Sequence, residues 1–337
     1  MKISICKRED IPALLDFICT HWKKDHVFVT CPDLLRWQHE NKDGGLNFML
    51  ARDEVSDEIL GIYGFIPQSF YDEKIHRISG YNEAWGAIWK VKENCTIPGL
   101  GVLLLKQVAR EFDFLGGIGL SEDSQQIYKL LRCKLGDMNQ YYVLNDSLKK
   151  YNIAVVNACL TARKSNERNC GIEKLSVLSG IDLKHAYRPF KTIDYLLNRY
   201  MNHPYYEYKF LGCYVADILE CILVVRNVSL GDSHCERIVD VYGSLEKIRD
   251  LGGALKQYAI LENAEYIDFF NWGIDKSYFL NNGFQYLDPD KDEIVIPNYF
   301  EPFLQKNVRL NYFYISKFES NLSFFKGDGD QDRPNML

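Results

Sequence analysis

Apolar and polar positions along the first half of the chain predict a mixed α/β unit. Apolar residues recur at helical spacing over Ile11–Trp22 and over Val102–Phe112. Alternating or continuous apolar runs predict strands at Lys2–Cys6, Asn47–Arg52, Glu58–Gln68, Ala84–Lys92, Leu115–Leu120 and Gln140–Leu144. Two more helices are expected over Pro32–His39 and Ser124–Arg132. The predicted order is strand, helix, helix, three strands, loop, helix, strand, helix, strand.

The second half repeats part of this order after the polar stretch Asn145–Tyr151. Strands are expected at Tyr208–Ala216, Ile218–Arg226, Arg237–Tyr242 and Tyr266–Phe270. A helix is expected over Leu245–Asn263, and the tail Lys326–Leu337 is polar and is expected to be irregular. The shared order suggests two copies of one α/β unit.

Composition agrees with a globular protein of two domains. The chain has 337 residues, of which 47% are apolar and 26% charged, with a formal net charge of −6. A length of roughly 150 residues per domain suggests two domains. The mild negative balance, without any Lys/Arg-rich block, argues against nucleic acid as a partner, because phosphate backbones require a clustered positive face.

Targeting signals are not expected at the start of the chain. No apolar run approaches the ~20 residues that span a bilayer. Charged residues over Lys7–Asp10 occupy the place where a signal peptide needs its apolar stretch. A cytoplasmic protein without a membrane span is therefore expected.

The ten cysteines form neither a C-x-x-C motif nor the Cys/His spacing of a zinc site. They are Cys6, Cys19, Cys31, Cys95, Cys133, Cys159, Cys170, Cys213, Cys221 and Cys235. In a reducing compartment most of them should be small buried apolar residues, and a catalytic thiol is not favoured.

A glycine turn, Pro98-Gly99-Leu100-Gly101, separates a predicted strand from a predicted helix. Such a turn exposes backbone N–H groups at a helix N-terminus, where the helix dipole favours an anion such as a pyrophosphate. The alternative is a helix cap without a ligand. The turn lacks the Gly-Lys-Ser/Thr of a P-loop and the third glycine of a dinucleotide fingerprint.

These residues resemble the GNAT acyltransferase superfamily, in which a strand, a Gln/Arg-x-x-Gly-x-Gly/Ala turn and a helix are followed by a strand and a tyrosine-bearing helix. Thr96–Gly101 matches both glycine positions, with Thr96 in place of Gln or Arg. Tyr128 falls at the tyrosine position, and Arg132-Cys133 replaces the usual Gly-Phe. In the second half, Arg249–Ala254 fits the turn, but Phe279 occupies the tyrosine position.

The resemblance implies two tandem GNAT-like domains, each a mixed, mostly antiparallel sheet flanked by helices. Residues 1–147 would form the domain that binds acyl-CoA, and residues 148–337 a degenerate domain that contributes to the acceptor site. Because Phe279 cannot donate a proton, the catalytic site is expected in the first half of the chain.

The whole chain further resembles tandem GNAT proteins encoded among bacterial surface-polysaccharide genes, such as O-antigen and capsule clusters. The strings that carry this resemblance are His21-Trp22-Lys23-Lys24, Ala87–Val91, Ile97–Gly101, Ile296–Phe303 and Gly327–Asn335. The likeness implies an N-acyltransferase that uses acetyl-CoA, or another acyl-CoA, on the amine of a nucleotide-linked deoxyamino sugar in lipopolysaccharide synthesis.

Three residues are candidates for proton transfer in such a reaction. Glu83 is the candidate base that takes the ammonium proton, His26 is an alternative base, and Tyr128 is the candidate acid that protonates the departing thiolate. The structural alternatives are a solvated carboxylate, a capping histidine and a core tyrosine.

The remaining candidate residues would hold the two substrates. Acyl-CoA would contact the strand and the glycine turn through Ile88, Trp89, Lys90, Val91, Pro98, Gly99, Leu100, Gly101 and Val102. The acceptor would contact His21, Trp85, Gln331, Asp332 and Arg333. Trp85 and Trp89, four residues apart, are expected to share a face of their strand.

No metal is expected. Asp328, Asp330 and Asp332 have the alternate spacing of a calcium loop, but Arg333 stands where that loop needs glycine, and the closing glutamate would lie beyond Leu337.

Two other functions remain open. A Fem-like aminoacyl transferase also uses tandem GNAT-like units, but it needs a basic face for tRNA. A non-catalytic tandem domain that binds a sugar nucleotide or a partner would fit Thr96, Arg132 and Phe279. The oligomeric state is not predicted.

Overall fold

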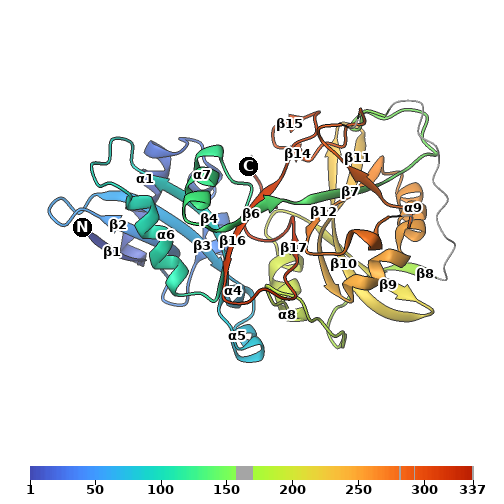
Figure 1. The fold of residues 1–337 in the computed structure, drawn as a ribbon, viewed down its shortest axis with the longest axis horizontal. Helices are drawn as coiled ribbons and strands as arrows, with labels where there is room; N and C mark the ends of the chain where they lie inside the picture. The colour runs from blue at the N-terminus through green and yellow to red at the C-terminus, as the bar shows by residue number, and fades with distance from the viewer. Residues whose placement is uncertain (157–169, 281, 292, 336–337) are drawn as a thin grey trace. The chain divides into compact units, whose positions relative to one another are not determined.

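The structure is a computed structural model that describes residues 1–156, 170–280, 282–291 and 293–335. Cys159 lies outside the described residues. The chain forms two compact units (Figure 1). Unit 1 comprises Met1–Gly136, Tyr312–Glu319 and Gly329–Leu337, and unit 2 comprises Asp137–Asn311 and Ser320–Asp328. The chain therefore passes between the units more than once, whereas the sequence predicts a single division after residue 147.

Unit 1 is built on a seven-stranded sheet of order β1-β2-β3-β4-β5-β16-β6. Its strands are β1 (Lys2–Cys6), β2 (Leu46–Arg52), β3 (Ile59–Pro67), β4 (Glu83–Val91), β5 (Phe114–Ile118), β16 (Asn311–Ser316) and β6 (Lys134–Asp137). Strands β1 to β4 pair antiparallel, β4 and β5 pair parallel, and β5 and β16 pair antiparallel. The predicted mixed, mostly antiparallel sheet is confirmed.

Helices cover both faces of this sheet. The helices of this unit are α1 (Ile11–His21), α2 (Val27–Thr30), α3 (Pro32–His39), α4 (Gln68–Tyr71), α5 (Lys74–Ser79), α6 (Leu100–Arg110) and α7 (Glu122–Leu130). One apolar cluster joins α1, α2 and α3 to one face of the strands, and Ile62 belongs to it. A second cluster joins α6 and α7 to the other face, where Tyr63 and Leu115 lie. The four apolar residues that recur along α6 at helical spacing (Leu100, Leu104, Leu105 and Val108) are buried.

Unit 2 contains an eight-stranded sheet whose main path runs β13-β7-β12-β11-β10-β9-β8, with β17 paired to β12. Its strands are β7 (Asn139–Leu144), β8 (Cys170–Leu175), β9 (Tyr208–Val215), β10 (Ile218–Leu230), β11 (Ser233–Gly243), β12 (Tyr266–Trp272), β13 (Gln285–Leu287) and β17 (Phe324–Phe325). The helices are α8 (Ile193–Leu196), which continues into a π-helical turn, and α9 (Gly252–Leu261). A small separate ribbon joins β14 (Tyr299–Phe300) to β15 (Phe303–Leu304).

The two sheets repeat the same strand order, read from β1 in one and from β8 in the other. The parallel pair β4–β5 of unit 1 corresponds to β11–β12 of unit 2. In each sheet the next strand comes from the other half of the sequence: β16 lies beside β5, and β7 lies beside β12. The repeated unit inferred from the sequence is therefore present, with one strand exchanged in each direction.

Two sequence-based expectations need correction. Gln140–Leu144 is a strand as predicted, but it does not close the first sheet, because Tyr266–Asn271 of β12 pairs with it in the second. The helix expected over Leu245–Asn263 is two elements, a 3₁₀ helix at Leu245–Asp250 and then α9. Apolar periodicity identifies a strand or helix but not its partner or an internal break.

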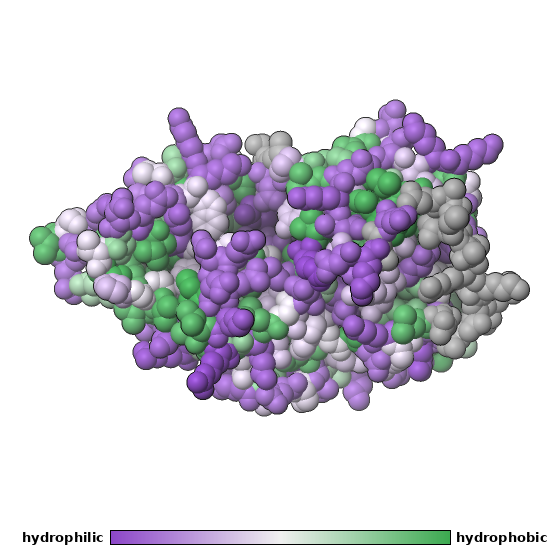
Figure 2. All heavy atoms as spheres, turned by 45° about the horizontal axis from the view of Figure 1, so that its top comes forward, coloured by the Kyte–Doolittle hydropathy of each residue, from purple (hydrophilic) through white to green (hydrophobic). Residues whose placement is uncertain are grey.

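Among the described residues, no helix is long and apolar enough to cross a membrane. On the face drawn in Figure 2, apolar side chains form small patches among polar ones. All nine described cysteines are free thiols, and four of them (Cys6, Cys213, Cys221 and Cys235) are buried.

Candidate active site

The central strands of unit 1 separate partway along their length. Strand β4 pairs with β5 at Glu83↔Phe114, Ala84↔Leu115 and Trp85↔Gly116, and the register ends there although β4 continues to Val91. Beyond Trp85, β4 remains paired with β3 through Val91. The edge of β4 from Gly86 to Val91 therefore faces an opening, where an extended ligand could add backbone hydrogen bonds as a strand does.

A β-bulge lies in β4 at this opening. Gly86 pairs with Phe65 and Trp89 pairs with Tyr63, so Ala87 and Ile88 together oppose one residue of β3. The extra residue turns the following side chains over to the opposite face of the sheet.

The bulge overturns the expectation that Trp85 and Trp89 share a face. Cross-strand partners lie on the same face, so Trp85 lies with Ile66, whereas Trp89 lies with Tyr63 on the other face. Trp85 is buried edge-on against Phe114 at a centroid distance of 5.2 Å. The spacing of four residues predicts one face only for a strand without a bulge.

A groove of about 640 Å³ runs along this edge of β4 to the start of α6. We call it the β4–α6 groove. Its walls come from the second half of β4 and the loop after it, from the first turns of α6 and α7, and from Trp22. Most residues predicted to hold acyl-CoA line it: Trp89, Lys90, Val91, Gly99, Leu100, Gly101 and Val102. Pro98 is exposed in the turn just before it.

The start of α6 presents backbone donors to the groove. Gly99 caps the helix with φ +70°, a conformation that favours glycine, and it is exposed. The first helical hydrogen bond there joins the Leu103 amide to the Gly99 carbonyl, so the amides before Leu103 belong to the first turn, which has no partners within the helix. At Gly101 a Cβ atom would lie 3.0 Å from the Trp89 indole, which explains the second glycine of the motif. This is the geometry of an anion site.

A second cavity, of about 260 Å³, adjoins the groove. We call it the Tyr128 pocket. The groove and the pocket share four wall residues, namely Trp22, Trp89, Ser121 and Ser124. Ile88, Tyr128, Gln331 and Arg333 also line the pocket, as predicted site residues. A ligand that lies along β4 could therefore bring its end beside Tyr128.

Tyr128 is a buried phenol whose ring is fixed by packing. It stacks on Phe313 with centroids 3.6 Å apart and lies 5.3 Å from the Trp89 ring. Burial, together with the neighbouring Tyr63, holds the pKa of Tyr128 well above its usual value. The hydroxyl therefore stays protonated at neutral pH, which is the state that a general acid requires.

Glu83 and the two histidines lie outside the residues that line the groove and the pocket. Glu83 is buried at the start of β4, in its paired portion. His21 ends α1 with its ring 4.9 Å from that of Phe17.

His26 caps α2, where its Nδ1 accepts a hydrogen bond from the Phe28 amide at 3.2 Å. Its Nε2 lies 3.4 Å from Arg333 Nη2. Burial and the positive charge of Arg333 lower the pKa of His26 to about 4, so the ring is neutral at pH 7.

The C-terminal tail is packed within unit 1. Arg333 Nε lies 2.7 Å from Asp330 Oδ1, and the Gln38 side chain donates to the same oxygen at 2.6 Å. The guanidinium also lies over the Phe28 ring, 5.0 Å from its centroid. Burial would raise the pKa of Asp330, but the charge and hydrogen bonding of Arg333, with the bond from Gln38, lower it.

Two other predicted residues of the tail, Gln331 and Asp332, are also packed against the protein. The Gln331 side chain lies against Gly119, where an added Cβ would meet it at 2.4 Å. Asp332 is buried, with a side chain that the pocket lining does not include. Among the described residues, no group of three His, Cys, Asp or Glu side chains could hold a metal ion.

Sequence reasoning missed three residues that line both cavities, Trp22, Ser121 and Ser124. Trp22 is 44% exposed, an unusual state for so large an aromatic residue, and it lies between the two histidines that were singled out. Ser121 caps α7, because its side-chain oxygen accepts a hydrogen bond from the Ser124 amide. A serine before Glu122-Asp123 is a helix-start signal that the sequence offered.

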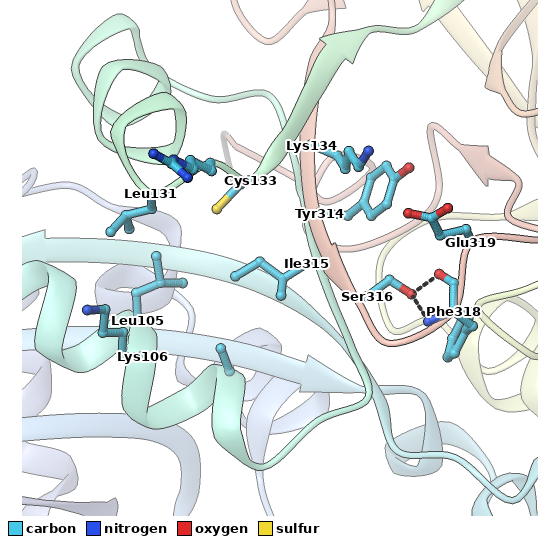
Figure 3. A pocket seen from close by; sticks show the side chains of 12 residues that line it. Leu105, Lys106, Leu131, Cys133, Lys134, Tyr314, Ile315, Ser316, Phe318 and Glu319 are labelled. Carbon is cyan, nitrogen blue, oxygen red and sulfur yellow. Dashed lines mark hydrogen bonds between the residues drawn. The ribbon is translucent and has the colours of Figure 1, made fainter.

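A third cavity of about 270 Å³ lies between α6, the end of α7 and β16 (Figure 3). Leu105, Cys133 and Tyr314 are among its walls, and none of the predicted site residues is. Burial raises the pKa of the Cys133 thiol to about 11, so this cysteine is not an activated nucleophile.

No model of a known protein family matches the chain, and no curated protein sequence matches it. Solved structures do. A GCN5-related N-acetyltransferase from Anabaena variabilis ATCC 29413 is 10% identical, with a TM-score of 0.53 over 93% of this chain and 72% of that one. A protein of unknown function from Enterococcus faecalis V583, described as a probable N-acyltransferase, is 8% identical, with a TM-score of 0.51 over 92% and 72%. At these identities the likeness defines the fold: this chain has the GNAT fold, with its sheet present twice.

Proposed function

We propose that the protein is an acyl-CoA-dependent N-acyltransferase, with acetyl-CoA as donor, that acylates a nucleotide-linked deoxyamino sugar in surface-polysaccharide synthesis. The observation that carries the proposal is the pair of adjoining cavities that runs from the start of α6, along the open edge of β4, to Tyr128. The neighbours of the GNAT fold support the coarser part, an N-acyltransferase. The amino sugar and its pathway rest on the sequence resemblance.

The two ends of the path suit the two ends of acyl-CoA. The pyrophosphate would accept hydrogen bonds from the amides of Leu100, Gly101 and Val102, with Lys90 and Lys92 in the same wall. The pantetheine arm would pair with the edge of Ile88–Lys92, where β4 has left β5. The thioester would then lie in the Tyr128 pocket.

The reaction forms an amide bond and breaks a thioester. The neutral amine attacks the carbonyl carbon, the carbon–sulfur bond breaks, and the sulfur takes a proton from the Tyr128 hydroxyl. The proton that the attacking nitrogen loses as the amide forms returns to the Tyr128 oxygen. The ammonium proton passes through water to Glu83 or His26, because neither side chain lines the pocket. The pKa of about 4 leaves His26 neutral at pH 7 but makes it a weak base, and its Nδ1 would have to release the Phe28 amide to take the proton.

The acceptor would enter beside the tail. Gln331 and Arg333 line the pocket and are the proposed contacts for the acceptor, with Arg333 suited to its phosphate. Trp22 lines the pocket and is a proposed acceptor contact, whereas Trp85, the tryptophan expected to contact the acceptor, is buried on the face of β4 opposite Trp89. His21 and Asp332 remain proposed acceptor residues without a place in the pocket lining.

The alternative functions have less support. A Fem-like transferase needs a basic tRNA face, and the net charge of −6 opposes one. A purely binding role would leave the open edge of β4 and the protonated phenol without a use.

Release of free CoA thiol tests the proposal. Acetyl-CoA is incubated with nucleotide sugars that carry a free amine, and with matched sugars that carry a hydroxyl at the same position. Thiol release and an amide product with the amino sugars only are expected. Transfer to the hydroxyl sugars alone would contradict N-acylation, and binding of the sugars without any release would favour the non-catalytic function.

A further inference from the structure

The parallel strands of unit 2 also separate, but there the chain itself occupies the opening. Strands β11 and β12 pair at Glu236↔Ile267, Arg237↔Asp268 and Ile238↔Phe269. Beyond Phe269, β12 pairs antiparallel with β17, at Asn271↔Phe325 and Trp272↔Phe324. On the other side, the Gly327 amide donates to the Val239 carbonyl of β11 at 2.7 Å. The segment Ser323–Asp328 thus bonds to both separated strands.

This segment fits the opening closely. A Cβ atom at Gly327 would lie 2.7 Å from the Val239 carbonyl oxygen and 2.5 Å from the Tyr200 hydroxyl, so only glycine fits. Phe325 is buried with its ring stacked on Phe269, at a centroid distance of 5.8 Å. The contacts are those of a core strand.

A buried ionic cluster holds the end of the segment. The Asp328 side chain accepts a hydrogen bond from the Phe325 amide at 2.8 Å. Lys191 Nζ lies 2.9 Å from Asp328 and 2.6 Å from Asp240. The Tyr200 hydroxyl donates to Asp240 at 2.6 Å. All four side chains are buried, so moving the segment would leave unpaired charges in the interior.

The glycine turn of unit 2, at the start of α9, is also covered by the chain. The sequence pattern aligns Gly252 at the start of α9 with the glycine turn of α6. Gly252 is buried, and a Cβ atom there would lie 1.7 Å from the Asn282 carbonyl oxygen. At Gly99, in contrast, nothing lies within 4 Å of an added Cβ. The Gly252 turn therefore serves backbone packing.

We infer that Ser323–Asp328 takes the place of a cofactor arm in unit 2, and that the chain binds one acyl-CoA, in unit 1. This inference rests on the proposed function, because it concerns the same ligand. The two units of the same fold would then differ in function. The opening between the strands of unit 1 binds the ligand, and the opening in unit 2 is filled by the chain's own strand.

Stoichiometry and hydrogen exchange on the full chain test the inference. Equilibrium dialysis should give one acetyl-CoA per chain, and none for Val102→Asp, which places a negative charge in the β4–α6 groove. In hydrogen–deuterium exchange, fragments covering Ser323–Asp328 should be protected with or without acetyl-CoA, whereas those covering Ile88–Lys92 should slow only when acetyl-CoA is added.

The outcomes separate the two claims. Two molecules per chain, or faster exchange of Ser323–Asp328 upon ligand addition, would overturn the inference and leave the proposed function standing. One site that survives Val102→Asp would overturn the inference and also remove the site at the start of α6 on which the proposed function rests. No binding at all would overturn the proposed function and the inference with it. Leu103→Asp, which puts the same charge on the exposed side of the same helical turn, is the control and should keep one site.

Discussion

Tyr128 stacks face to face on Phe313, with ring centroids 3.6 Å apart and an interplanar angle of 14°. Unit 2 repeats the pair as Phe279 on Tyr141, at 3.9 Å and 13°. In each pair the second ring belongs to the exchanged strand, β16 or β7. Only unit 1 has a hydroxyl on the ring at the tyrosine position of the motif, so the repeat itself singles out Tyr128.

Removing the Tyr128 hydroxyl should slow the chemical step and leave the binding of acetyl-CoA intact. For Tyr128→Phe we expect kcat to fall by roughly 10²–10⁴, the usual contribution of a general acid. The affinity for acetyl-CoA should stay close to that of the wild type, since the stacked ring is kept. Steady-state kinetics with calorimetry measures both.

The matched control is Tyr141→Phe, which removes the hydroxyl from the equivalent stack of unit 2 and should leave kcat unchanged. A Tyr128→Phe enzyme with wild-type kcat would remove Tyr128 from the mechanism.

Arg333 should contribute to recognition of the acceptor. Loss of one charged hydrogen-bonding group costs about 1.5–3 kcal/mol, so Arg333→Ala should raise KM for a nucleotide-sugar acceptor by roughly 10–100-fold. KM for acetyl-CoA should not change, because Arg333 lines the Tyr128 pocket and not the β4–α6 groove. Arg36→Ala, at an exposed position on α3, serves as the control. Equal rises in both KM values would indicate a general loss of structure instead.

Lys191 should be among the residues on which the stability of unit 2 depends most. Lys191→Met would leave Asp240 and Asp328 buried without their cation, and breaking a buried pair in this way costs about 3–5 kcal/mol. Lys306→Met, at an exposed position, should change stability by less than about 0.5 kcal/mol. Urea unfolding compares them, and equal midpoints for the two variants would refute the role of the cluster.

Asp328 gives this cluster an unusual pH dependence. Burial and the negative charge of Asp240 raise the pKa of Asp328 to about 6, although Lys191 offsets part of the rise. A carboxyl group with a raised folded-state pKa contributes stability that is present below the unfolded pKa of about 4 and is lost as the pH rises through about 6.

The variant Asp328→Asn imitates the protonated form. The free energy of unfolding of the variant minus that of the wild type should therefore be larger at pH 7.5 than at pH 4.5. Urea midpoints of both proteins at both pH values measure this difference. A difference between the proteins that does not change with pH would show that Asp328 keeps its ordinary pKa.

Local elements and the glycine turn were predictable because their signals are local. The strand at β4, the helix at α6 and the turn at Gly99 follow from apolar periodicity and from the conformational freedom of glycine. The elements and the turn depend on neighbours within a few residues, and such patterns are visible in a sequence. Tyr128 came instead from the resemblance to the GNAT order, and its role in proton transfer stays a prediction.

The missing features depend on partners far along the chain. The β-bulge that separates Trp85 from Trp89 arises from pairing with β3. Gly86 beside it is a local sign of a bulge, but it does not show which side chains change face. Strand β16 and the residues around Arg333 reach unit 1 from the end of the chain. The tail's acidic and glycine-rich composition is typical of a solvated terminus, yet Asp328 and Asp332 are buried.

Calorimetric titration of acetyl-CoA into Val102→Asp and Leu103→Asp tests the central claim most directly. Both variants add one carboxylate to the first turn of α6, where the helix dipole favours it, so both should fold. Val102 lines the groove, and Leu103 is 43% exposed. We predict that acetyl-CoA binds the wild type and Leu103→Asp with similar affinity and fails to bind Val102→Asp. Equal binding to the two variants would contradict an acyl-CoA site at the start of α6.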